Sequence, residues 1–292
     1  MFNIGESTLP VILAIVLPAA FAALLGYVMF YGRISDVYLG VITLTVTLIL
    51  FNSVNSTAGP EYHIGVAPLG GFNGIPSIPP LNWPGFPDAP LDLNDLFYVA
   101  IVVLLATYFG LSWLLVSRFG RVMVAIRENE QRAGFLGYDA RLFKLATFTL
   151  GGGLAGLAGC LFANWGAFVS PTIFGLGQSA QIIIWVIVGG RGTLIGPVIG
   201  CIGIQWLTAS LGSAQLTGAG GLAVLKTSLA PVFGPTFAQA VASTLGVVDL
   251  GNVNLVLGAV LLAFVLLVPK GVVPSLLDLV RPVWPTKADG VP

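Results

Sequence analysis

Seven long apolar stretches, separated by short polar segments, dominate the pattern of the chain. A helix needs about 20 mostly apolar residues to cross the roughly 30 Å hydrocarbon core of a bilayer, and most of the stretches approach that length. The predicted crossings are Leu9–Tyr31, Val37–Phe51, Leu96–Val116, Leu145–Phe168, Thr172–Gly190, Thr193–Leu211 and Val253–Val268. We therefore predict an all-α fold, a polytopic transmembrane helix bundle with about seven spans.

One pair of stretches leaves two interpretations open. Thr172–Gly190 and Thr193–Leu211 are separated only by the sequence GGRGT, and the run GGRGTLIGPVIG over residues 189–200 is dense in Gly and Pro. These residues interrupt helices, and broken helices are tolerated in a membrane where they line a cavity or are buried in protein. The pair is either two crossings or a re-entrant, broken pair.

The composition places the chain in the membrane. Of the 292 residues, 56% are hydrophobic and only 8% are charged, with a mean hydropathy of +0.96. A soluble domain typically has about 25% charged residues, so the 12 basic and 12 acidic residues cannot cover the surface of a soluble protein of this size. The net charge is zero and no basic block is present, which excludes a nucleic-acid partner. The lipid bilayer is the expected surrounding.

The distribution of charge predicts the orientation. Segment 117–144 contains six Lys or Arg residues, whereas segment 52–95 has four acidic residues and no basic ones. Cytoplasmic loops carry the excess of Lys and Arg, so we predict a cytoplasmic loop at 117–144 and an external loop at 52–95. Counting crossings then places the tail 269–292 in the cytoplasm and the stretch Gly212–Gly251 outside.

The chemistry of an enzyme is missing from this pattern. The predicted spans contain no ionisable side chain away from their edges, and we expect Cys160 and Cys201 to be small packing residues rather than metal ligands. No phosphate-binding loop of the form GxxxxGK[ST] is present. We therefore expect no catalytic residue, no metal and no cofactor, and any ATP must be hydrolysed by another chain.

Small and neutral polar residues supply the remaining candidates. Gly152 and Gly156 are four residues apart, a spacing that lets helices approach closely, and we predict that they serve packing. Neutral hydrogen-bonding groups and a broken helix suit a pathway for a polar solute. The candidate pathway residues are Gln178, Gln181, Gly189, Gly190, Gly192, Gly196 and Pro197. The candidates in the external loop, which is either a stiff cap or the mouth of that pathway, are Gly70, Gly71, Asn73 and Gly74.

The cytoplasmic segment has helical periodicity from Arg121 to Leu136. Val122, Ala125 and Ile126 share one face of this helix, and the charged side chains lie elsewhere. We predict a single short amphipathic helix ending near Gly134 or Gly137. It is either a solvated loop helix or a docking element for a cytoplasmic partner.

At this segment the sequence resembles a known family. The run FGRVMVAIRENEQRAGFLGYDARLFKLATF is followed by AGLAG, FVSP, VGGRGTLIGPVIG and LLVPKGVV, and LGGFNGI lies in the external loop. These motifs resemble those of the permease subunits of branched-chain amino acid ABC importers, and the related urea and short-amide importers share them. Leu69 stands where the family usually has threonine. The matched motifs cover roughly residues 32–211 and the last span.

The resemblance implies a function and a set of partners. Residues 1–292 would form a single transmembrane permease domain of the bacterial inner membrane, importing branched-chain or similar amino acids. The partners would be a second homologous permease subunit, two cytoplasmic ATP-binding subunits and a periplasmic solute-binding protein. Import of urea or a short amide is the alternative within the family, and a passive channel or a non-transporting, truncated scaffold is the alternative outside it. The family's additional N-terminal spans are expected to be missing.

The resemblance also assigns the cytoplasmic loop to contact with the ATPase. The residues expected to couple the permease to ATP hydrolysis are Arg121, Ala125, Arg127, Glu128, Asn129, Glu130, Arg132, Gly137 and Tyr138.

Overall fold

The computed structural model describes most of the first three quarters of the chain. The described residues are 7–32, 34, 36–58, 61–64, 67–76, 78–83, 86–190, 192–217 and 274. The predicted crossing Val253–Val268 lies outside them, as do the tail 269–292 except Pro274 and the predicted external stretch beyond residue 217. The chain divides into two compact units, Met1–Gln178 and Ser179–Pro292.

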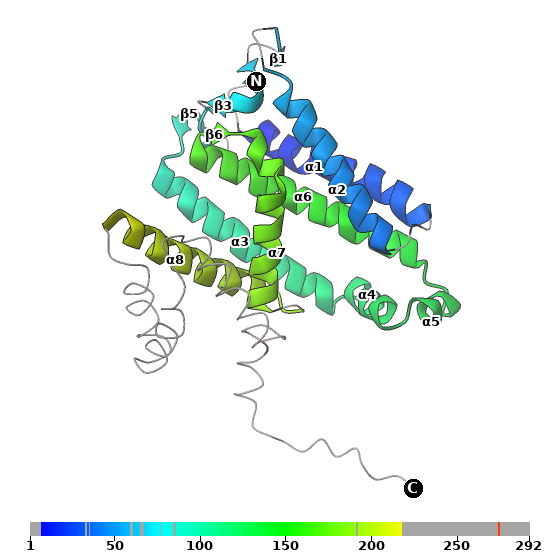
Figure 1. Cartoon of the computed structure of the whole chain (residues 1–292). Coiled ribbons are helices and arrows are strands. Elements are labelled where there is room, and N and C mark those ends of the chain that lie inside the picture. Colours follow the sequence, from blue (N-terminus) through cyan, green and yellow to red (C-terminus); the bar gives the residue numbers. More distant parts are fainter. Residues whose placement is uncertain are drawn as a thin grey trace, which may run out of the picture. The chain divides into compact units, whose positions relative to one another are not determined.

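Four helices of the first unit are long and apolar enough to cross a membrane. They are α1 (Thr8–Tyr31), α2 (Asp36–Asn55), α3 (Leu93–Val116) and α6 (Ala140–Gly166). Their axes run roughly along one common direction (Figure 1). Their side chains are largely exposed, including Trp113 of α3 at 75%, as expected for helices that face lipid or other helices. These helices confirm an all-α, polytopic membrane bundle.

Of these four helices, α1 matches its predicted bounds within one residue, whereas α2, α3 and α6 begin or end several residues away from theirs. The largest difference among the four is in α6, which begins at Ala140 rather than Leu145. The cause is a local cap, since Asp139 Oδ1 accepts a hydrogen bond of 3.1 Å from the backbone N–H of Arg141. Hydropathy does not detect such a cap. Because α6 begins at Ala140, Arg141 and Lys144 lie on the spanning helix rather than in the loop before it.

Glycines of α6 pack directly against α1. A Cβ atom placed on Gly152 would lie 2.5 Å from the Ala22 Cβ, and one on Gly156 would lie 2.6 Å from the Pro18 Cγ. Neither position has room for a side chain, so the two backbones approach as the four-residue spacing predicts. This contact confirms the packing role predicted for Gly152 and Gly156.

Short strands and 3-10 turns gather at one end of these helices, as Figure 1 shows. They are β1 (His63–Ile64), β2 (Ala67–Pro68), η1 (Gly71–Asn73), β3 (Ile75–Pro76), β4 (Asn82–Trp83), β5 (Phe86–Pro90), β6 (Phe168–Val169) and η2 (Pro171–Phe174). β1 pairs with β2, β4 with β5, and β3 with β6, all antiparallel. The Ile75–Val169 pair joins the loop after α2 to the chain after α6. Ser7 Oγ, just before α1, accepts a hydrogen bond from the Asn82 backbone, so three distant segments meet here.

Two short helices lie at the opposite end. α4 (Arg118–Glu128) follows α3 directly, and α5 (Glu130–Phe135) precedes α6. Ile126 of α4, Ala133 of α5 and Ala140 of α6 form a buried cluster. This cluster fixes α4 and α5, which form the segment predicted to be cytoplasmic, against the first turn of α6.

The second unit contains most of α7 (Leu176–Gly189) and all of α8 (Gly196–Thr217). α7 has 14 residues, and at 1.5 Å per residue it is about 21 Å long, shorter than the hydrocarbon core. It begins later than the predicted Thr172 because Pro171–Phe174 forms η2 and Gly175 is extended. Of the two interpretations of this pair, the short α7 favours the broken one.

Candidate functional site

The glycines of the external loop hold a tight turn against the rest of the chain. Gly70, Gly71 and Gly74 have φ angles of 67°, 54° and 77°, which side chains other than glycine adopt only with strain. A Cβ on Gly71 would lie 2.5 Å from the Ala58 Cα, beyond the end of α2, and one on Gly74 would lie 3.0 Å from the Ser170 Cα. These glycines therefore fold the loop into a cap, and Asn73 remains exposed on it.

The candidate pathway glycines form the hairpin between α7 and α8. A Cβ on Gly189 would run into the backbone of Gly196 and Pro197, and one on Gly196 would lie 2.6 Å from the Gly190 carbonyl oxygen. Gly190 and Gly192 have φ angles of 123° and 88°. The density of glycine is thus explained by a sharp turn and close contact between the helices, and a role of these residues in a pathway stays a prediction.

Gly192 differs from the other hairpin glycines. It has a positive φ angle, but no described atom lies within 4 Å of a Cβ placed on it. Thr193 closes the turn by donating from Oγ1 to the Gly190 carbonyl oxygen at 3.1 Å. Gly192 is therefore needed for the backbone conformation and not for close packing.

The two candidate glutamines lie three residues apart on α7. Gln178 is exposed and Gln181 is half-buried, and residues three apart share one face of a helix. Both lie on α7, although Gln178 ends the first unit and Gln181 belongs to the second.

Two buried polar atoms were missed by the search for ionisable residues. Asn164 of α6 donates from Nδ2 to the Cys160 carbonyl oxygen at 2.9 Å, but its Oδ1 is buried with no hydrogen-bond partner among the described residues. Trp185 Nε1 of α7 is likewise buried and has no hydrogen-bond partner among the described residues. Leaving a buried polar atom unpaired costs about 1–3 kcal/mol. A neutral amide and an indole carry no charge, so neither residue stands out in the sequence as a candidate polar site.

The cytoplasmic segment is two helices rather than the predicted one. Asn129 has extended angles, φ −159° and ψ 102°, which end α4 at Glu128. Its Oδ1 then accepts a 2.9 Å hydrogen bond from the backbone N–H of Arg132 and caps α5. The prediction of a continuous helix over Arg121–Leu136 is therefore wrong, because asparagine favours a cap over a helix interior.

An ion pair also connects this segment to the spanning helix. Lys144 Nζ of α6 lies 2.7 Å from Glu130 Oε2 of α5. Glu128 pairs with its neighbour Arg127 at 2.9 Å. Both pairs are substantially exposed, and exposed pairs contribute at most about 1 kcal/mol. The buried cluster of α4, α5 and α6 therefore does more to hold the segment.

The residues predicted to couple the permease to an ATPase form an open surface. Every one of them is exposed: Arg121, Ala125, Arg127, Glu128, Asn129, Glu130, Arg132, Gly137 and Tyr138. Sequence analysis missed the apolar part of this surface. Phe135 is 89% exposed and Leu136 74%. Their position between Gly134 and Gly137 at the end of α5 is the signal that was available, because a helix end flanked by glycines exposes its side chains.

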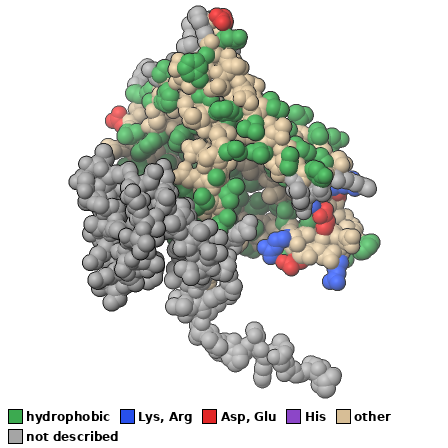
Figure 2. Space-filling model, viewed as in Figure 1, with side chains coloured by type: hydrophobic (Ala, Val, Ile, Leu, Met, Phe, Trp, Pro, Cys, Tyr) green, Lys and Arg blue, Asp and Glu red, His purple; other side chains and the backbone are tan. Residues whose placement is uncertain are grey.

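Positive charge is concentrated at this end of the first unit. Among the described residues, every Lys and Arg lies between positions 118 and 144. In the space-filling view, Lys and Arg side chains gather where α4 and α5 lie, Asp or Glu side chains appear at both ends, and hydrophobic side chains are spread over the faces of the long helices (Figure 2). Among the described residues, the structure thus separates a basic end from the end that carries the glycine-rich cap.

Comparison with known proteins assigns the chain to a family. The family described as branched-chain amino acid transport system / permease component matches residues 4–265. The chain belongs to this family. Membership confirms the resemblance given by the motifs and, with the four long apolar helices, identifies a multi-pass membrane protein of the permease type.

Individual relatives of this permease family share about a third of the aligned residues. The high-affinity branched-chain amino acid transport system permease protein LivM of Escherichia coli (strain K12) is 31% identical over 197 residues, covering 63% of this chain and 46% of the relative. LivM of Salmonella typhimurium (strain LT2) is 30% identical over 203 residues, covering 65% and 47%. The autoinducer 2 import system permease protein LsrC of Salmonella paratyphi B is 35% identical over 97 residues, covering 31% and 28%.

The chain spans about half the length of the LivM proteins that it matches. No solved structure matches it significantly.

Proposed function

We propose that the chain is the membrane-spanning permease subunit of an ABC importer for branched-chain or similar amino acids in the bacterial inner membrane. It contains no phosphate-binding loop, so ATP is hydrolysed by two separate cytoplasmic subunits. A second homologous permease subunit completes the pathway, and a periplasmic binding protein delivers the solute. Family membership and the likeness to LivM support this proposal.

The observation that carries the proposal is the exposed apolar end of α5. Phe135 and Leu136 are exposed at the end of a segment that is held against α6 by buried contacts, and the same segment carries exposed charged residues such as Glu130 and Arg132. Large exposed apolar side chains beside polar ones are typical of a protein–protein contact. A permease without its own ATPase must receive energy through such a contact, since a partner can shift its conformation only where the two proteins touch.

Replacing both apolar residues tests the contact. In the full chain expressed with its companion subunits, Phe135→Ser with Leu136→Ser should lower co-purification of the ATPase at least about tenfold and abolish solute-stimulated ATP hydrolysis. Leu142→Ser is the matched control, because Leu142 is also an exposed leucine, at 55%, but lies on α6. Parental ATPase binding and hydrolysis by the double variant would show that α5 is a solvated loop helix.

The solute is tested separately by uptake. Cells that lack their own leucine importers and express the chain with its companion genes should accumulate labelled leucine against its gradient, and unlabelled valine and isoleucine should compete. Urea and autoinducer 2 serve as alternative competitors, the second because LsrC is also similar. Uptake that only equilibrates leucine and does not require ATP would indicate a passive channel instead.

A further inference from the structure

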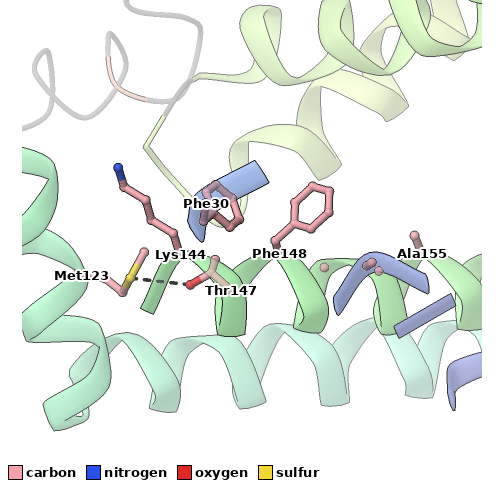
Figure 3. Close-up of a pocket in the computed structure, with 9 residues that line it drawn as sticks. Phe30, Met123, Lys144, Thr147, Phe148 and Ala155 are labelled. Atoms are coloured by element: carbon pink, nitrogen blue, oxygen red, sulfur yellow. Dashed lines mark hydrogen bonds between the residues drawn. The ribbon is translucent and has the colours of Figure 1, made fainter. Parts of the chain in front are cut away.

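An open apolar groove of about 550 Å³ runs along α6 in the first unit. Phe30 of α1 and Met123 of α4 form its sides. Figure 3 shows Lys144, Phe148 and Ala155 following one another along α6, with Phe30 between Lys144 and Phe148. Small residues, Gly151 and Ala155 among them, line the end of the groove that is far from Lys144. The groove therefore has a cation at one end and hydrocarbon along the rest.

The length of the groove matches one leaflet of a bilayer. Lys144 and Ala155 lie on one continuous helix, about 16 Å apart at 1.5 Å per residue. The hydrocarbon core is about 30 Å thick, so each leaflet contributes about half of this distance. The groove can therefore accommodate one lipid chain from its head-group end to its tip.

The charged end of the groove lies among the basic residues near α4 and α5. Lys144 Nζ donates to Glu130 Oε2 at 2.7 Å, and an ammonium group has three donors, so it can also bind a phosphate oxygen. Arg141 lies one turn earlier on α6, with its Cζ 6.0 Å from the centre of the Tyr31 ring of α1. Both cations lie where the anionic head groups of the cytoplasmic leaflet are expected.

We propose that the groove binds an anionic phospholipid, with one acyl chain along Phe30, Phe148 and Ala155 and the phosphate at Lys144. Charge complementarity selects a lipid with a negative head group over a neutral one, and the apolar lining selects a lipid over free phosphate. This site does not depend on which solute the permease carries.

The head-group contact is tested on the full chain purified from a membrane that contains phosphatidylglycerol and phosphatidylcholine. Native mass spectrometry should find phosphatidylglycerol retained in preference to phosphatidylcholine. Lys144→Gln should lower its retention about fivefold, and Lys144→Arg should not. Glu130→Gln removes the ion pair but leaves the cation, so it should retain at least as much lipid as the parent. Inorganic phosphate should not displace the lipid.

The apolar contact is tested by filling the groove. No described atom lies within 4 Å of a Cβ placed on Gly151, which lines the groove, or on Gly159, which does not. Gly151→Leu should therefore occupy the groove without disturbing α6 and displace the lipid. Gly159→Leu is the matched control and should retain it.

Three results would overturn the proposal. One is equal retention of the two phospholipids by the parent, and another is normal retention of phosphatidylglycerol by Lys144→Gln or Gly151→Leu. The third is loss of a companion permease subunit from the Gly151→Leu complex with lipid binding unchanged, which would assign the groove to a neighbouring protein.

Discussion

Glycines on the same helix have opposite roles in this permease. A Cβ on Gly156 of α6 would run into the Ala14 carbonyl oxygen and Pro18 of α1, whereas no described atom lies within 4 Å of a Cβ on Gly159, one turn further on. Both glycines belong to the same GGGLAGLAG run. The run of small residues does not distinguish the two glycines, but in the structure only Gly156 of the two is in close contact with α1.

This difference predicts stability effects of opposite sign. Gly156→Ala should push α1 and α6 apart and cost about 1–3 kcal/mol. Gly159→Ala should stabilise α6 by up to about 1 kcal/mol, because alanine loses less backbone entropy in a helix than glycine does. The temperature at which half of the purified protein leaves the monodisperse peak in size-exclusion chromatography measures both. Equal shifts in the two variants would contradict the proposed α1–α6 contact.

At the scale of elements, the four long helices were predictable because a membrane selects for long apolar runs, which any hydropathy window detects. Their ends were less predictable, because side-chain caps such as that of Asp139 decide them. The pairing of β3 with β6 could not be predicted, since strands of two residues leave no periodic signal.

The residues of the candidate site could likewise be predicted only in part from the sequence. The charged residues of the cytoplasmic loop were found from sequence because charge is unusual in this chain. The exposure of Phe135 and Leu136 was not predicted from the sequence, because an apolar side chain in a membrane protein is expected to face lipid or the protein core. The groove beside Lys144 depends on how α1 and α4 pack on α6, and this packing cannot be derived from the amino-acid sequence by pattern alone.

The break between α4 and α5 gives a test at this scale. Asn129→Ala removes the acceptor of the Arg132 N–H, and loss of such a cap costs about 1 kcal/mol. Hydrogen exchange at the amides of α5 should therefore accelerate about fivefold, as followed by mass spectrometry. Asn129→Asp keeps an acceptor at the same position and should exchange as the parent does. Slower exchange in Asn129→Ala would mean that α4 and α5 join into the single helix that periodicity predicts.

At the scale of the whole first unit, the chain reverses direction with each long helix. The β3–β6 pair and the contact of Ser7 with Asn82 gather the external loop, the start of α1 and the end of α6 at one end. All described Lys and Arg residues lie at the other. Because cytoplasmic loops carry the excess of Lys and Arg, we expect the basic end to face the cytoplasm. The ATPase contact proposed for α5 requires that orientation.

Cysteine labelling tests the orientation directly. In a background with Cys160→Ala and Cys201→Ala, we introduce Asn73→Cys in the external cap or Gln131→Cys in α5; both positions are exposed. A membrane-impermeant thiol reagent added to intact cells should modify residue 73 and leave residue 131 unmodified until the membrane is opened. The charge at the α4–α5 end makes the reverse insertion unfavourable, because six basic residues would have to be translocated. Labelling of residue 131 in intact cells would place α5 outside, where no cytoplasmic ATPase can reach it.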